Sequence, residues 1–543
     1  MADDGPDAAI PPDLEIHYEA REPERDPTLG IAVDAGATRA GPPPHRLVVI
    51  GDSISHGFMS AAIFRTEVSL PAIVAYELGL LLAPPGTVTD RTDVFRYPVY
   101  EPPNGPGGLP FDIERFLKKL QAQYGTDLSF GELFKAAFFA NRHLDAVEDF
   151  WERKADAEVP MLTATPHNLS VYGWDVRDIL STSYDAIAQD LASYPAVDDL
   201  VPWRQLVDRD TSRAAMRVLG PAHAEDAGVQ TAVDAATALG GHGGDGPGIE
   251  TLCVVIGANN ALASMLKLKV AWSGEDFADL AQKGKYTVWQ PKHFAAEWAV
   301  LEARLRSIKA RNLIVATVPS VTIAPVARGV PAKLAHGSRF FPNYTRPWIE
   351  PDAFDARHDA NITGDQARAI DSAVDAYNAV IIESVRRARR DGLNWFLFDL
   401  GGLLDSLASK RYLSDPAARP AWWREYPLPA PLQAMDPVPN TRFFRSGAQG
   451  RIDGGLFSLD GVHPTTIGYG IVAQEVIRIM TSAGVTFRSQ TGDVRTDGVE
   501  VDWRRLLAAD SLNSAPPALL DDGLGLLGWL DQRLDWVSGA LGR

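Results

Sequence analysis

The chain has 543 residues, of which 45% are hydrophobic and 22% are charged, as in ordinary globular proteins. Its formal net charge of −18 argues against binding to nucleic acid or to an anionic membrane surface, because both demand clustered Lys and Arg. A single cysteine, Cys253, excludes an intramolecular disulfide, and its apolar context TLCVVI predicts a small buried side chain.

The N-terminal stretch MADDGPDAAIPPDLE lacks the basic start and the apolar core that are typical of a secretory signal. No stretch of the sequence approaches the roughly 20 uninterrupted apolar residues that a membrane span needs. We therefore expect a cytoplasmic protein with no integral membrane segment.

Composition divides the chain into three parts. Residues 1–45 are acidic and rich in proline, which predicts a flexible arm. Residues 46–480 are expected to form one α/β domain, and residues 481–543 a helical C-terminal extension. In that extension one helix face gathers apolar residues, and we expect it to dock on its own domain rather than on a membrane or a partner; these residues are Leu527, Leu530, Leu534 and Val537.

Short runs of β-branched and aromatic residues recur along the domain. Such continuous apolar runs are typical of strands buried on both faces of a parallel sheet. The runs are RLVVI (46–50), NLSVY (168–172), TLCVVI (251–256), NLIVATV (312–318) and NWFLFDL (394–400). Helical patterns lie between them, as in GDQARAIDSAVDAYNAVIIESVRRARRDG from residue 364. This alternation predicts an α/β fold with a central parallel sheet of about five strands.

The predicted strands lie far apart in the sequence, so large and mainly helical insertions are expected between them. We place these insertions at about 85–165, 185–250, 320–365 and 402–455. Within the first, FGELFKAAFFANRHLDAVEDFW suggests either a mobile lid with an apolar face or the core of an inserted helical subdomain, and we favour the core.

Small or polar residues follow several of the predicted strands. Ser53 follows the first, Gly173 the second, and Asn259 and Asn260 the third, while the late segment LDGVHPTTIGYG supplies a carboxylate and an imidazole, Asp460 and His463. In an open parallel sheet, functional side chains gather at the carboxyl ends of the strands. These residue types are the ones that a serine hydrolase requires: a hydroxyl, a histidine base, a carboxylate that orients the base, and donors to an oxyanion.

Four segments, GDSIS, NLSVYGWDVRDIL, VVIGANNAL and LDGVHPTTIGYG, resemble in order the conserved blocks of the GDSL, or SGNH, hydrolases. The resemblance implies a flavodoxin-like three-layer α/β/α fold. It makes Ser53 the nucleophile, His463 the base and Asp460 the partner of the base. It makes the N–H of Ser53, the N–H of Gly173 and the side chain of Asn259 the oxyanion donors.

Each of these residues also has a structural alternative. Ser53 could simply end a strand, His463 could lie at a helix start, and Asp460 could open a turn. Gly173 could serve only a backbone turn, and Asn259 could cap a helix, with Asn260 as an equal claimant. The third block of the family usually reads Gly-x-Asn-Asp, so Asn260 also departs from the family pattern.

The sequence therefore predicts a carboxylic ester hydrolase that acts on a small-molecule or lipid acyl ester through an acyl-Ser53 intermediate. No cofactor is expected, and no metal site, because the 11 histidines lack the paired spacing of metal ligands. The chain also lacks the Gly-x-Ser-x-Gly elbow of the α/β-hydrolases. Two alternatives remain: an acyltransferase that uses the same residues, or an inactive member kept for binding.

Overall fold

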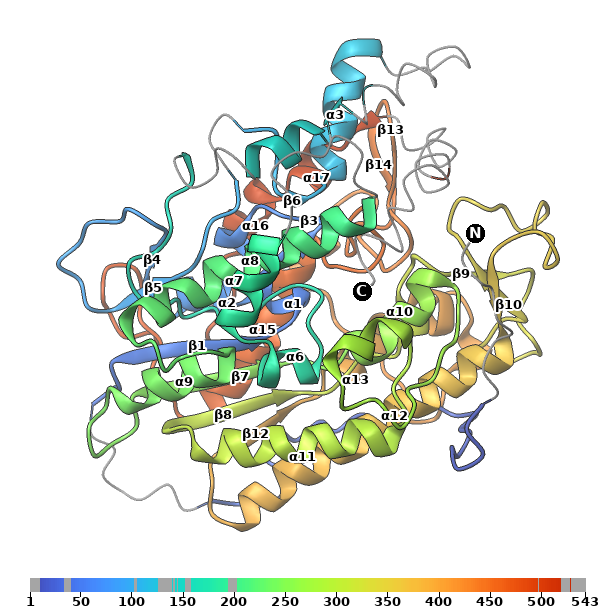
Figure 1. Cartoon of the computed structure of the whole chain (residues 1–543). Helices are drawn as coiled ribbons and strands as arrows, with labels where there is room; N and C mark the ends of the chain where they lie inside the picture. The colour runs from blue at the N-terminus through green and yellow to red at the C-terminus, as the bar shows by residue number, and fades with distance from the viewer. Residues whose placement is uncertain are drawn as a thin grey trace.

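The computed structural model describes residues 10–33, 41–101, 105–125, 139, 142–143, 145–151, 158–193, 203–496, 498–518 and 528. At its centre lies a four-stranded parallel sheet with the order β1-β7-β8-β12 (Figure 1). The strands are β1 (His45–Gly51), β7 (Ile249–Val255), β8 (Ala310–Ala316) and β12 (Trp395–Phe398).

The sheet is buried on both faces, as its continuous apolar strands predict. Successive side chains of a strand point to opposite faces, so Val48 and Ile50 join one hydrophobic cluster while Leu47 and Val49 join another. Cys253 of β7 lies in the second cluster, where burial raises the pKa of its thiol to about 12.

Helices cover both faces of the sheet (Figure 1). On one face α9 (Ala232–Gly241), α11 (Pro291–Ser307) and α12 (Gly364–Arg390) build the first cluster. On the other face α2 (Leu70–Glu77) packs against α15 (Thr466–Ser482) in the second cluster. The predicted α/β fold with a central parallel sheet is confirmed at this level.

The segment at 168–172 differs from the regular strand that the sequence predicts. It runs along β1 with one parallel bridge, between Val49 and Asn168. The Val49 N–H donates to His167 O at 2.8 Å, the Leu169 N–H donates to Val49 O at 2.8 Å, and the Val171 N–H donates to Gly51 O at 3.1 Å. The Ser170 N–H points away from β1, since the N–H groups of Leu169 and Val171 point toward it, and it donates to Asn168 Oδ1 at 3.2 Å.

Further elements complete the fold, some of them within the predicted insertions and others outside them. The other α-helices whose bounds the structure gives are α1 (Ser53–His56), α3 (Ile113–Tyr124), α6 (Val176–Ser181), α7 (Tyr184–Ser193), α8 (Trp203–Glu225), α10 (Asn259–Lys267), α13 (Leu400–Leu407), α14 (Ala430–Gln433), α16 (Trp503–Ala509) and α17 (Ser511–Ser514). The small sheets pair β2 (Phe58–Met59), β3 (Ala62–Ile63) and β6 (Leu109–Pro110); β4 (Leu81–Ala83) and β5 (Val94–Arg96); β9 (Arg328–Val330), β10 (Asn343–Thr345) and β11 (Asn361–Thr363); and β13 (Arg445–Gly447) and β14 (Gly450–Asp453).

The two ends of the chain are described in part. Residues 10–33 lie against the domain, where the Leu397 N–H of β12 donates to Pro27 O at 2.9 Å and Arg21 pairs with Asp399 at 2.5 Å. The apolar face predicted at 527–537 lies outside the described residues. Most of the candidate lid at 130–151 does too, although Phe150 and Trp151 are buried in the first cluster. Within the described residues, no helix has the length and apolar character to cross a membrane.

Candidate active site

The turn that leaves β1 holds Ser53 in a fixed position. A Cβ atom on Gly51 would lie 2.2 Å from Ser55 Oγ and 2.3 Å from Val255 O, so only glycine fits there. The Asp52 carboxylate then caps α1, because it accepts a hydrogen bond from the Ile54 N–H at 3.1 Å. Ser53 therefore begins α1 at the carboxyl end of β1, with 5% of its surface exposed.

The loop before α15 organises itself through its own hydrogen bonds. Asp460 Oδ1 accepts from the N–H groups of Val462 and His463, both at 2.8 Å. The Ser458 N–H donates to His463 O at 2.7 Å, and the Gly461 N–H donates to Ser458 O at 2.9 Å. Gly461 has φ +68°, the left-handed conformation that favours glycine.

Ser53, His463 and Asp460 form one hydrogen-bonded chain, although 410 residues separate the serine from the histidine. His463 Nε2 lies 2.7 Å from Ser53 Oγ, and His463 Nδ1 lies 3.1 Å from Asp460 Oδ2. An ionised carboxylate only accepts hydrogen bonds, so Nδ1 carries the proton and Nε2 is left to accept from the serine hydroxyl. This is the orientation that a general base needs.

The Asp460 carboxylate is adapted to remain ionised although it is completely buried. Burial alone would raise its pKa, but the positive charge that His463 carries when it is protonated opposes this effect. Hydrogen bonds from the His463 ring, the His463 N–H and the Ala61 N–H act in the same direction, and together they hold the pKa of Asp460 below its ordinary value. The carboxylate therefore keeps the charge that would stabilise an imidazolium at His463.

A hydrogen bond connects the segments that carry two of the predicted oxyanion donors, Gly173 and Asn259. The Asn259 side chain donates to Trp174 O at 2.7 Å, directly beside Gly173, which has φ +77°. Across the described residues, neither the Ser53 N–H nor the Gly173 N–H has a protein acceptor, and the second N–H of the Asn259 amide has none. Three hydrogen-bond donors therefore remain available to a ligand.

Asn259 and Asn260 differ in their surroundings. Asn260 is completely buried, and its Oδ1 accepts from the Val176 N–H at the start of α6 at 3.3 Å. Asn259 is partly exposed at the start of α10. Of the two amides, Asn259 is the one that a ligand can reach, while Asn260 supports the segment behind it.

Two buried groups close to Ser53, Asp52 and His56, have no role predicted from the sequence. Burial raises the pKa of Asp52 to about 7 and lowers the pKa of His56 to about 3. Both residues fall inside the GDSISHG stretch, and their position next to Ser53 was the only signal in the sequence that could have drawn attention to them.

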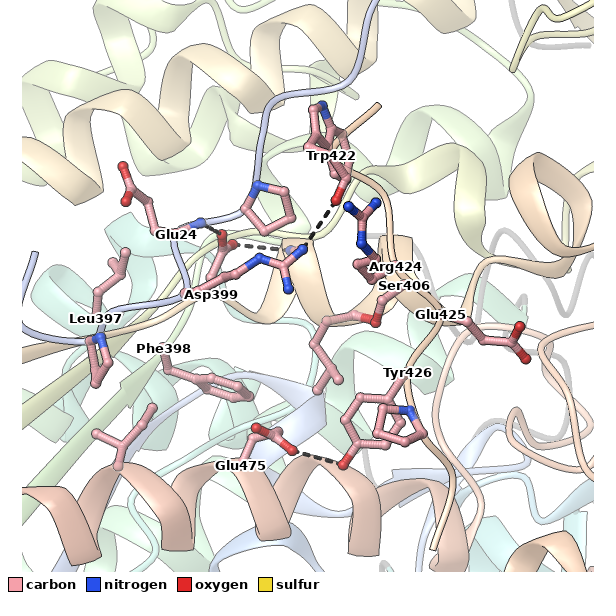
Figure 2. Close-up of a pocket in the computed structure, with 17 residues that line it drawn as sticks. Glu24, Leu397, Phe398, Asp399, Ser406, Trp422, Arg424, Glu425, Tyr426 and Glu475 are labelled. Carbon is pink, nitrogen blue, oxygen red and sulfur yellow. Dashed lines mark hydrogen bonds between the residues drawn. The ribbon is translucent and has the colours of Figure 1, made fainter. Parts of the chain in front are cut away.

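A cavity of about 260 Å³ opens at the opposite edge of the sheet, beside β12 and α13 (Figure 2). Its polar groups largely satisfy one another: Tyr426 donates to Glu475 at 2.7 Å, and Arg25 donates to Trp422 O at 3.1 Å. Strands in a sheet are about 4.8 Å apart, so β12 lies roughly 14 Å from β1. The cavity is therefore separate from Ser53. In the described part of the chain, no cluster of three or more His, Cys, Asp or Glu residues is arranged to hold a metal ion.

Comparison of the chain with protein-family models and with curated proteins finds no match in either set. The function proposed below therefore rests on the geometry of Ser53 and its neighbours.

Proposed function

We propose that this protein is a serine ester hydrolase of the GDSL, or SGNH, type that acts on a small-molecule or lipid acyl ester. The observation that carries the proposal is the 2.7 Å contact between Ser53 Oγ and His463 Nε2, with Asp460 behind the ring at 3.1 Å. A serine hydroxyl is a weak nucleophile by itself, and a base within hydrogen-bond reach is what activates it.

The reaction divides into two steps. Ser53 Oγ attacks the ester carbonyl carbon while His463 Nε2 takes the hydroxyl proton, and the negative charge collects on the carbonyl oxygen. The Ser53 N–H, the Gly173 N–H and the Asn259 amide would donate to that oxygen. The C–O bond to the alcohol then breaks, and His463 returns the proton to the leaving alkoxide, which leaves an acyl-Ser53 ester.

Water completes the cycle by the same chemistry. His463 takes a proton from water, the resulting hydroxide attacks the acyl carbon, and Ser53 leaves as an alkoxide that recovers the proton from His463. The carboxylic acid departs and the site is restored. In each step Asp460 stabilises the charged imidazolium and keeps Nδ1 protonated.

The strand arrangement supports the same family. If residues 167–171 beside β1 are counted as a short strand, the order in the sheet becomes second, first, third, fourth, fifth in chain order. This is the order of the flavodoxin-like doubly wound fold, in which ligands bind at the carboxyl ends of the strands on either side of the reversal. The reversal falls between the first and third strands; Ser53 lies at the end of the first, and Asn259 follows the third.

The proposal is tested by hydrolysis of p-nitrophenyl acetate, butyrate and octanoate with wild-type protein, Ser53→Ala and Ser406→Ala. Ser406 is a matched control, because it is the serine that lines the separate cavity of Figure 2. We expect Ser53→Ala to lose turnover and Ser406→Ala to retain it. Equal rates for wild type and Ser53→Ala would remove Ser53 from the mechanism.

A covalent probe gives an independent answer. A fluorophosphonate phosphonylates an activated serine, and peptide mapping by mass spectrometry should place the label on Ser53. Adding glycerol to the ester assay then separates water from an alcohol as the acyl acceptor. Acylglycerol in excess of free acid would identify an acyltransferase that works through the same acyl-Ser53.

A further inference from the structure

The buried ring of His56 connects the helix that carries Ser53 to the segment that carries Gly173. Its Nδ1 atom accepts a hydrogen bond from the Tyr172 N–H at 3.1 Å, and its Nε2 atom lies 3.1 Å from Tyr100 Oη. A second contact runs in parallel, since the Asn168 amide donates to Ser55 O at 3.0 Å. The last two residues of α1 therefore hold residues 168–172 in place.

The positions of the protons on His56 and Tyr100 follow from one group that can only donate, the Tyr172 N–H. The Tyr172 N–H can only donate, so His56 Nδ1 carries no proton and the ring proton lies on Nε2. Nε2–H then donates to Tyr100 Oη, and the Tyr100 hydroxyl donates to Ala214 O at 3.0 Å. Burial lowers the pKa of His56 to about 3, so the ring stays neutral and Nδ1 remains an acceptor near neutral pH.

The Tyr172 N–H belongs to a tight turn whose third residue is Gly173. The Trp174 N–H donates to Val171 O at 3.4 Å, and Gly173 has φ +77°. A positive φ at the third position is characteristic of a type II turn, and a type I turn differs from it by a flip of the central peptide. That central peptide carries the Gly173 N–H. Glycine tolerates both forms, so contacts outside the turn must select one of them.

Two such contacts flank the central peptide. His56 fixes the peptide before Tyr172, and Asn259 fixes the carbonyl of Trp174 at 2.7 Å. We propose that His56 is a positioning residue of the active site: by accepting from the Tyr172 N–H, it holds the turn in the form that presents the Gly173 N–H to the oxyanion. The inference rests on the proposed ester hydrolysis and adds to it a residue that does not touch the substrate.

Two substitutions distinguish the hydrogen bond at His56 Nδ1 from the hydrogen bond at His56 Nε2. Asn places its Oδ1 as many bonds from Cα as His places Nδ1, so His56→Asn keeps an acceptor for the Tyr172 N–H. Gln places its polar atoms one bond further out, so His56→Gln keeps a partner for Tyr100 and loses that acceptor. Tyr100→Phe removes only the distal end of the chain and serves as the control.

We expect His56→Gln to lower kcat for p-nitrophenyl butyrate by about 30–100-fold with KM changed by less than about threefold, since a displaced donor weakens the transition state more than the ground state. We expect His56→Asn to restore kcat to within about fivefold of wild type. Equal losses in the Gln and Asn variants would show that the acceptor at Nδ1 is not what matters, and would overturn the inference.

The outcomes separate this inference from the proposed function. Ester hydrolysis that requires Ser53 but is unaffected by His56→Gln would overturn the positioning role and leave the enzyme intact. If the wild type cleaves no ester, crystal structures of His56→Gln and His56→Asn test whether the conformation of the turn at Gly173 depends on an acceptor at position 56. We expect a changed φ at Gly173 in the Gln variant and +77° retained in the Asn variant, and an unchanged turn in both overturns the inference. If His56→Gln does not fold, His56→Leu replaces it in both experiments.

Discussion

The two halves of the proposed active site are held in place by different kinds of contact. The loop that carries the proposed base, Ser458–His463, is closed within itself by bonds between residues two to five positions apart, and bonds from Ser60, Ala61 and Val326 anchor it to the rest of the domain. The segment that carries Gly173 is held by distant partners: Tyr172 bonds to His56 across 116 residues, and Trp174 bonds to Asn259 across 85. The turn of the first half is therefore closed mainly by its own residues, whereas the contacts that fix the second half come mainly from distant parts of the chain.

This difference has consequences for substitutions. Asp460 both orients the base and shapes the loop, so a change there removes two functions at once. On the oxyanion side, three residues together fix the segment that carries Gly173. His56 bonds to Tyr172, Asn168 bonds to α1, and Asn259 bonds to Trp174. We therefore expect large and non-additive losses on the base side and graded losses on the oxyanion side.

The largest effect should follow removal of the base. We expect His463→Ala to lower kcat by about 10⁴–10⁶-fold, because Ser53 then has no group to take its proton. The double variant Ser53→Ala/His463→Ala should be no slower than either single variant, since the residues act as a unit. Losses that multiply in the double variant would show that Ser53 and His463 work independently.

The next effect tests whether Asp460 serves both the ring and the loop. We expect Asp460→Asn to lower kcat by about 10⁴-fold, because an amide does not enforce the same imidazole tautomer. Its NH₂ group would also face a backbone N–H, which should reduce the free energy of unfolding by about 1–3 kcal/mol. Urea denaturation measures the second quantity. A variant of unchanged stability would contradict the role of Asp460 in closing the loop.

The oxyanion side should respond more weakly. We expect Asn259→Ala to lower kcat by about 10²–10³-fold, the range for one lost oxyanion donor. Asn260→Ala is the matched control: its amide faces the start of α6 and no ligand, so we expect it to reduce stability more than turnover. A near-normal rate for Asn259→Ala together with a large loss for Asn260→Ala would show that Asn260, and not Asn259, donates to the oxyanion.

The same contrast explains what the sequence could predict. The Asp-Gly-Val-His loop and the Gly-Asp-Ser turn each contain local side-chain-to-backbone bonds, and short motifs that resemble those of a known family were enough to predict Ser53, Asp460 and His463 as a triad. Continuous apolar runs likewise predicted the four regular strands. The order of the strands and the 2.7 Å contact of the triad depend on contacts across hundreds of residues, which no local pattern reports.

The oxyanion segment shows the limit of that approach. NLSVY has the apolar pattern of a regular strand, but it pairs with β1 through a single bridge, and its Asn168 side chain bonds to Ser55 O and to the Ser170 N–H. His56 stands three residues after Ser53 and has no distinctive spacing. Its importance becomes visible only when the position of Tyr172 is known.

The smallest predicted effect concerns stability at the point where the two halves meet. Burial is the main cause that raises the pKa of Asp52 to about 7, against hydrogen bonding from Ile54 and the charge of His463. In the unfolded chain the Asp pKa is about 3.9. Between about pH 4 and pH 7 the folded protein thus binds more protons at this site than the unfolded chain, so Asp52 reduces stability as the pH rises through this window.

An amide in place of the Asp52 carboxylate would remove that loss while its Oδ1 continues to accept from the Ile54 N–H. For Asp52→Asn we therefore expect a Tm equal to wild type at pH 4 and higher by roughly 1–3 °C at pH 8. Asp112→Asn is a parallel test remote in sequence, and we expect the same pH-dependent gain there, because Asp112 also caps a helix and burial also raises its pKa to about 7. Scanning calorimetry at both pH values checks the sign. A difference in Tm that does not grow with pH would mean that Asp52 is ionised in the folded protein throughout, and that its carboxylate does not destabilise the turn beneath Ser53.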